Sequence, residues 1–148
     1  MSKPVPFETT LLVRDTCLCL HAQRAARSLA RHFDEALRPV GLTNQQFSLL
    51  MALNRPEPPP MSPVADLLAM DRTTLTAALK PLERRGLVRV MPSATDRRSR
   101  LLVLTEAGSR ALAAAMPIWT NTHAAIELGL VSYDPATLRA ALAALSAL

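Results

Sequence analysis

The sequence predicts a mostly α-helical protein with one small β-hairpin. Of the 148 residues 49% are hydrophobic but only 3% are aromatic, so the core must be built from Leu, Ala, Val and Met, most of which favour helices. Apolar residues recur at helical spacing over most of the chain, and a period of two replaces it around residues 87–104. This length and composition suit one domain with a real core. We therefore expect a single domain over residues 1–148.

The excess positive charge lies in one segment. The chain carries 17 basic and 12 acidic side chains, a net charge of +5. Residues 71–100 hold eight of the basic and three of the acidic ones, so this segment accounts for the whole excess. A local basic surface favours a polyanionic partner, and nucleic acid is the commonest one, because neutralising its phosphates releases bound counterions.

Residues 10–40 are expected to form one long amphipathic helix. From Leu12 to Leu37, apolar residues recur every three or four positions and arginines lie between them. Gly41 follows as the residue that ends this helix.

Thr43 is expected to open the second helix. Thr43 followed three residues later by Gln46 is a capping box, and apolar spacing continues through Leu53. Residues 55–60, RPEPPP, have no helical capacity, so they predict a stiff extended connector.

Two short helices are expected next. Ser62 as N-cap with Pro63 at the first helical position starts a helix that ends near Ala69. Asp71 caps the following helix, and Gly86 stops it. This helix places different residues on opposite faces: Leu75, Ala78, Leu79 and Leu82 on one, and Thr73, Ala77, Lys80 and Arg84 on the other.

A β-hairpin and two more helices complete the chain. Residues 87–91 and 101–104 read as strands, and the polar loop between them is suited to reaching outward. Thr105 caps a long Ala-rich helix, and Asp134 caps a last one. Because the end helices carry more apolar surface than a small monomer covers, residues 10–40 and 105–148 are expected to be dimerisation helices.

Two short helices, a tight turn and a two-stranded wing are the arrangement of a winged helix-turn-helix. Here the sequence resembles the multiple antibiotic resistance regulator (MarR) family through three motifs. They are GLTNQQFSLLMAL at 41–53, DRTTLTAALKPLERRGLV at 71–88 and DRRSRLLVLTEAG at 96–108. The resemblance also covers the order of all six helices and the wing, so it extends over nearly the whole chain after the first ten residues. The resemblance implies a DNA-binding region at residues 43–104, and a homodimeric repressor that binds a pseudo-palindromic duplex.

The resemblance also implies which residues contact DNA. Arg97 or Arg98 would reach the minor groove, where a narrow groove enhances the negative potential, and Asp96 would orient a wing arginine. Hydroxyls near a helix N-terminus can hold phosphate oxygens. The alternative is a solvated charged face. The full set of expected DNA contacts is Ser62, Arg72, Thr73, Thr74, Thr76, Lys80, Arg84, Arg97, Arg98 and Arg100.

The two cysteines raise a redox alternative. The resemblance extends to the organic-peroxide-sensing branch of the family, which places its reactive cysteine near the start of the first helix, where Cys19 lies. Gln23, Phe33 and Asn44 stand where those sensors carry tyrosines, and Cys19 shares an apolar helix face with Phe33. A buried thiol in such surroundings is unreactive, so we expect a core cysteine and keep the peroxide sensor as the alternative. Cys17 and His21 alone do not make a metal site.

Catalytic motifs are absent from the sequence. Its three histidines have no Ser, Cys or acid in a recognisable order beside them, and no phosphate-cradling loop occurs. We expect no enzyme, no cofactor and no metal. The resemblance implies a small lipophilic effector bound in an apolar cleft between the dimer helices and the winged domain. Without a long apolar run the protein is expected in the cytoplasm. A winged-helix module that docks an acidic protein remains an alternative to DNA binding.

Overall fold

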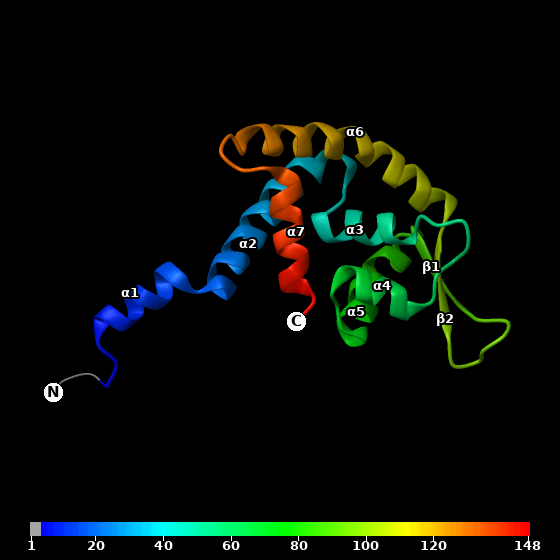
Figure 1. The fold of residues 1–148 in the computed structure, drawn as a ribbon. Helices are drawn as coiled ribbons and strands as arrows, with labels where there is room; N and C mark the ends of the chain where they lie inside the picture. Colours follow the sequence, from blue (N-terminus) through cyan, green and yellow to red (C-terminus); the bar gives the residue numbers. More distant parts are fainter. Residues whose placement is uncertain (1–3) are drawn as a thin grey trace.

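The computed structural model describes residues 4–148. Figure 1 shows an arm of two helices on one side and a compact group of short helices with a hairpin on the other. A long helix runs across the top of both parts, and the last helix returns beneath it. The fold is mostly helical with one two-stranded antiparallel sheet, as the sequence predicts.

The arm consists of α1 (Phe7–Thr16) and α2 (Leu18–Leu37). The prediction of one continuous helix over residues 10–40 is wrong, because the backbone is extended at Cys17, with a ψ of 110°. Cys17 instead caps α2, since its sulfur accepts a hydrogen bond from the amide of Leu20 at 3.4 Å.

A tight turn joins α2 to α3 (Asn44–Leu53). It contains a short 3-10 helix, η1 (Arg38–Val40), and Gly41 in the left-handed region at φ 70°. The capping box is confirmed, because the Thr43 hydroxyl accepts from the Gln46 amide and the Gln46 side chain accepts from the Thr43 amide, both at 3.1 Å.

The connector over residues 55–60 is non-helical, as predicted, and its last residues lie beside the hairpin. The amide of Leu102 donates to the carbonyl oxygen of Pro59 at 2.8 Å, and Pro60 forms an antiparallel β-bridge with Leu101. The connector therefore ties the start of the next helix to the wing.

The next helix, α4 (Met61–Leu68), begins directly after Pro60 and has no side-chain cap. The prediction that Ser62 is its N-cap is wrong by two residues, because the β-bridge at Pro60 sets the point where the helix can start. The helix ends near Ala69 as expected, and Ala69 itself adopts a left-handed φ of 51°.

A turn that contains Ala69 leads from α4 into α5 (Arg72–Arg84). The two helices and this turn form the helix-turn-helix. Gly86, at φ 71°, then redirects the chain into the hairpin. Its strands β1 (Val88–Pro92) and β2 (Arg100–Leu104) pair antiparallel along their full length. Asp71 caps α5 as predicted.

Both predicted caps of the C-terminal helices are confirmed. Thr105 accepts a hydrogen bond from the amide of Gly108 at the start of α6 (Glu106–Gly129), and Asp134 caps α7 (Pro135–Ser146) in the same way.

The core lies between α2, α3, α4, α5, the hairpin and the first half of α6. Its largest fully buried side chains are Leu37, Leu49, Leu50, Leu75, Leu79, Leu82, Leu102 and Val64. By contrast, no residue of α1 or α7 is buried, although both helices carry large apolar side chains. Within residues 4–148, none of the helices has the length and apolar character needed to cross a membrane.

Candidate nucleic-acid interface

Helix α5 presents a polar face because its opposite face is anchored in the core. Leu75, Leu79 and Leu82 are buried, whereas Thr73, Thr76, Ala77 and Lys80 are exposed. The N-terminus is fixed by Asp71, whose carboxylate accepts from the Thr74 amide at 2.7 Å and from the Thr74 hydroxyl at 3.0 Å. These hydrogen bonds lower the pKa of Asp71 below its ordinary value of 3.8, and the bond from the Thr74 backbone amide has the largest effect.

Three adjoining surface hollows share one residue, Arg72. The first lies along the outer face of α5, the second between α5 and the hairpin, and the third between α4 and the wing loop. They bring together seven residues predicted to contact DNA, which we call the Arg72 surface: Ser62, Arg72, Thr73, Thr76, Lys80, Arg98 and Arg100.

The positive charge of the Arg72 surface is not neutralised by ion pairs. Across residues 4–148, the ion pairs lie on α1, around the end of α2, and on α6 and α7. Two carboxylates, Glu83 and Asp96, line its hollows. A surface with exposed cations and few internal partners is suited to binding phosphate oxygens.

The wing loop is held by Asp96 through the main chain. The Asp96 carboxylate accepts from the backbone amide of Arg98 at 3.0 Å. It therefore shapes the loop through the main chain, whereas an arginine side chain was its predicted partner. The guanidinium of Arg100 donates to the carbonyl oxygen of Arg97 at 3.4 Å. Arg97 and Arg98 are both exposed at the tip.

Three predicted contacts lie outside the Arg72 surface. The Thr74 hydroxyl is occupied in the α5 cap, Arg84 lies at the far end of α5, and Arg97 lies beyond the hollows. Arg85 was not among the predicted residues. Its guanidinium donates to the Gly41 carbonyl oxygen at 2.8 Å and so joins the end of α5 to the η1 turn. A contact between residues so far apart in the chain leaves no local sequence signal.

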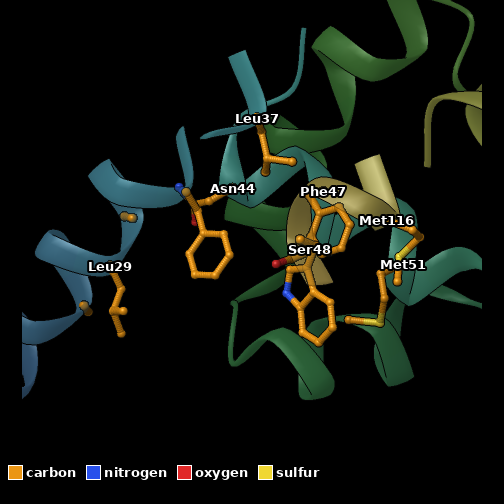
Figure 2. A pocket seen from close by; sticks show the side chains of 11 residues that line it. Leu29, Leu37, Asn44, Phe47, Ser48, Met51 and Met116 are labelled. Atoms are coloured by element: carbon orange, nitrogen blue, oxygen red, sulfur yellow. The ribbon is translucent and has the colours of Figure 1, made fainter. Parts of the chain in front are cut away.

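A separate apolar pocket lies between α2, α3 and α6. Its volume is about 460 Å³, and Figure 2 shows Leu29 on one side, Met51 and Met116 on the other, and Phe47 and Ser48 between them. The rings of Phe47 and Trp119 stack with centroids 6.3 Å apart. The lining residues are Ala26, Leu29, Ala30, Phe33, Leu37, Asn44, Phe47, Ser48, Met51, Met116 and Trp119. The pocket has the apolar character expected of an effector cleft.

The expectation that Cys19 is a core cysteine is wrong for this chain. Cys19 is exposed, because the first turns of α2 extend beyond the core and bury no residue. The side-chain amide of Gln23 donates a hydrogen bond to the Cys19 sulfur at 3.0 Å. The Cys17 carbonyl oxygen is hydrogen-bonded to Nδ1 of His21 at 2.7 Å. No group of three or more His, Cys, Asp or Glu residues suited to a metal occurs in the described part of the chain.

Comparison with known proteins identifies related regulators. A sequence model described as the MarR family matches residues 42–99. The transcriptional activatory protein BadR of Rhodopseudomonas palustris is 39% identical over 88 residues, which are 57% of this chain and 50% of BadR. The organic hydroperoxide resistance transcriptional regulator of Bacillus subtilis is 30% identical over 103 residues, 70% of this chain and 69% of that protein. The chain thus spans half the length of BadR.

The solved structures agree with the sequence relatives. The crystal structure of the transcriptional regulator MosR of M. tuberculosis in complex with DNA superposes with a TM-score of 0.80 at 40% identity. The superposition covers 88% of this chain and 94% of that one. It includes the winged helix-turn-helix, so the fold predicted from the sequence is confirmed.

Proposed function

The chain belongs to the MarR family of transcriptional regulators, and from this premise we propose that it is a sequence-specific DNA-binding repressor. It acts in the cytoplasm as a homodimer on a pseudo-palindromic operator, and a small lipophilic ligand releases it. The observation that carries the proposal is the Arg72 surface, where α4, α5 and the wing contribute cations and hydroxyls to one continuous exposed face.

DNA reading is assigned to α5 and the wing. The N-terminal residues of α5, Arg72, Thr73 and Thr76, would meet base edges and phosphates in the major groove, as the second helix of a helix-turn-helix does. Arg97 and Arg98 at the wing tip would enter the adjacent minor groove, whose potential attracts arginine. The DNA complex of MosR, a relative at 40% identity, supports DNA binding by this fold.

Dimer formation is assigned to the terminal helices. Leu138, Leu142 and Leu145 recur on α7 and are between 39% and 45% exposed. Such a stripe is normally covered by a partner. A two-fold dimer would present two copies of α5 to successive major grooves, which lie about 34 Å apart.

Ligand control would act through the apolar pocket. Its walls come from α2, α3 and α6, so it lies where the second helix of the arm packs beside α3 and α6. A ligand that favours one packing of these helices would change the separation of the two α5 helices and release DNA.

Selection of fragmented genomic DNA on the purified protein tests the proposal. At about 0.15 M salt much non-specific binding is suppressed. We expect enrichment of a palindrome with half-sites about one helical turn apart. A loss of enrichment in Arg72→Ala, with Arg31→Ala on α2 as the control, would tie the result to the Arg72 surface. No enriched sequence would contradict the proposal and favour docking of an acidic protein.

A thiol-based response through Cys19 is a second candidate function. Its sulfur is exposed and accepts a hydrogen bond from Gln23, and the organic hydroperoxide resistance regulator is a 30% identical relative. The thiol would take one oxygen from an organic hydroperoxide, giving a sulfenic acid and the corresponding alcohol. Cumene hydroperoxide should then release native protein and Cys17→Ser from DNA but not Cys19→Ser. Equal release of all three would exclude Cys19 as the sensor.

A further inference from the structure

The apolar pocket between α2, α3 and α6 contains no charged side chain. Nine of its eleven lining residues are apolar or aromatic, and Asn44 and Ser48 supply its polar side chains. In Figure 2 the oxygen of Ser48 lies beside Phe47, in the middle of the pocket wall. A volume of about 460 Å³ falls within the range of small-molecule sites. An anionic ligand would therefore lose its water without gaining an ion pair.

The hydrogen-bonding state of Asn44 is set by Asp34. Both the backbone amide and Nδ2 of Asn44 donate to Oδ1 of Asp34, at 2.7 and 2.8 Å. A carboxylate only accepts hydrogen bonds, so the nitrogen of the side-chain amide must face Asp34. Oδ1 of Asn44 is an acceptor and Nδ2 keeps a second hydrogen, and no hydrogen bond within residues 4–148 uses either of them. A ligand hydroxyl can use both, because it donates and accepts, whereas an ether oxygen only accepts.

Asp34 also gives this end of the pocket a negative charge. The two hydrogen bonds from Asn44 lower the pKa of Asp34 below 3.8, and the bond from the backbone amide has the larger effect. The Asp34 carboxyl group is therefore ionised at neutral pH. None of the ion pairs formed by residues 4–148 includes Asp34. An anionic ligand bonded to Asn44 would lie close to this unpaired carboxylate, and the two like charges would repel each other.

We propose that the pocket selects ring-containing lipophilic molecules with one hydrogen-bond donor and no negative charge, and that it rejects organic carboxylates. The stacked rings of Phe47 and Trp119 provide a flat wall for a ring, Asn44 accepts from the donor, and Asp34 disfavours anions. This inference rests on the proposed function, because it specifies the class of ligand to which the regulator responds.

Three probes of one shape test the selectivity by calorimetry with the full chain. The probes are 4-phenylphenol, 4-methoxybiphenyl and biphenyl-4-carboxylate. The phenol should bind about 2- to 10-fold more tightly than the methyl ether, the usual net effect of one hydrogen bond. The carboxylate should bind at least about tenfold more weakly than the ether. A carboxylate that binds as tightly as the phenol, or no binding of either neutral probe, would overturn the inference.

Two variants separate the charge from the hydrogen bond. Asp34→Asn keeps an acceptor for Asn44 and removes the charge, so it should strengthen binding of the carboxylate and leave the phenol unchanged. Asn44→Ala removes the free acceptor but keeps the backbone bond to Asp34, so the phenol should lose its advantage over the ether. Unchanged ratios in both variants would contradict the assigned roles, provided that circular dichroism confirms native folding.

DNA binding by the same preparation distinguishes a wrong ligand class from a wrong proposed function. If the protein selects a palindrome but prefers the carboxylate probe, the ligand class is wrong and the regulator assignment stands. If the probes rank as expected but no DNA is selected, the pocket assignment stands and the proposed function is wrong.

Discussion

A Cβ atom at Gly108 would overlap the backbone carbonyl oxygen of Leu87. This contact joins the first turn of α6 to the start of the hairpin. The same junction contains two hydrogen bonds from Thr105, from its hydroxyl to the Gly86 carbonyl oxygen at 2.7 Å and from its amide to the Leu87 carbonyl oxygen at 3.1 Å. The wing is therefore positioned by α6, the helix that also lines the apolar pocket.

Gly108→Ala should destabilise the protein. The added methyl group meets main-chain atoms, which cannot move aside as a flexible side chain does, so the free energy of unfolding should fall by about 1–3 kcal/mol. Urea denaturation measures this change. The matched control is Gly129→Ala at the other end of α6, where an added Cβ would meet no atom within 4 Å apart from its chain neighbours and the backbone of its own helix. That variant should be neutral or stabilised by up to about 1 kcal/mol, and equal destabilisation of both would refute the steric argument.

Asp34 should contribute to the loss of stability in acid. Its pKa is lower in the folded chain than the ordinary 3.8, so its contribution is fully present above that value and is lost as the pH falls through the folded pKa. In Asp34→Asn the free energy of unfolding should therefore decrease less between about pH 5 and pH 2 than in the native chain. Glu57→Gln, in the exposed connector, is the control. If both variants kept the native acid dependence, the Asn44 bonds would not be the cause.

Arg72 and Arg84 provide a matched test of the surface within one helix. Both are exposed arginines of α5, but only Arg72 lines the three hollows. Arg72→Ala should weaken binding of the selected duplex by about 1–3 kcal/mol, and Arg84→Ala should have a clearly smaller effect. Fluorescence anisotropy with a labelled duplex measures both. A larger loss in Arg84→Ala would mean that the DNA contacts the other end of α5.

The wing arginines should contribute to affinity through phosphates and the minor groove. Arg98→Ala should weaken DNA binding and make its salt dependence shallower by about 0.9 in the slope of log K against log salt, the value for one phosphate contact. Binding measured at several salt concentrations gives this slope. Arg31→Ala, which removes the same charge from α2, should leave it unchanged. A native slope in Arg98→Ala would contradict the wing assignment.

The features predicted correctly from the sequence depend on interactions between residues close together in the chain. Thr43, Asp71, Thr105 and Asp134 each cap a helix as predicted, because a cap is formed with the amide three residues ahead and its pattern is visible in a short segment. The Leu face of α5 follows from helical spacing for the same reason.

Predictions were wrong where contacts between residues far apart in the chain determine the local structure. Ser62 has the properties of a cap, but the contact between Pro60 and Leu101, about forty residues apart in the chain, starts α4 earlier. The break at Cys17 interrupts a helical pattern that continues on both sides. Cys19 was expected in the core from that pattern, but its side chain is exposed. The Arg72 surface and the pocket each combine segments whose proximity only the fold reveals.

We expect α7 to form the dimer interface. Leu138 and Leu142, four residues apart on α7, lie on one face and are 40% and 45% exposed. The double variant Leu138→Glu/Leu142→Glu would place two charges in a buried interface, so sedimentation equilibrium should detect monomers and affinity for the palindrome should fall. Leu67→Glu on α4, a residue 55% exposed outside the proposed interface, should remain dimeric. A native chain that is itself monomeric would contradict this prediction. A double variant that stays dimeric would also contradict it, because the carboxylates added to each α7 would have to lose their water in the interface without a partner.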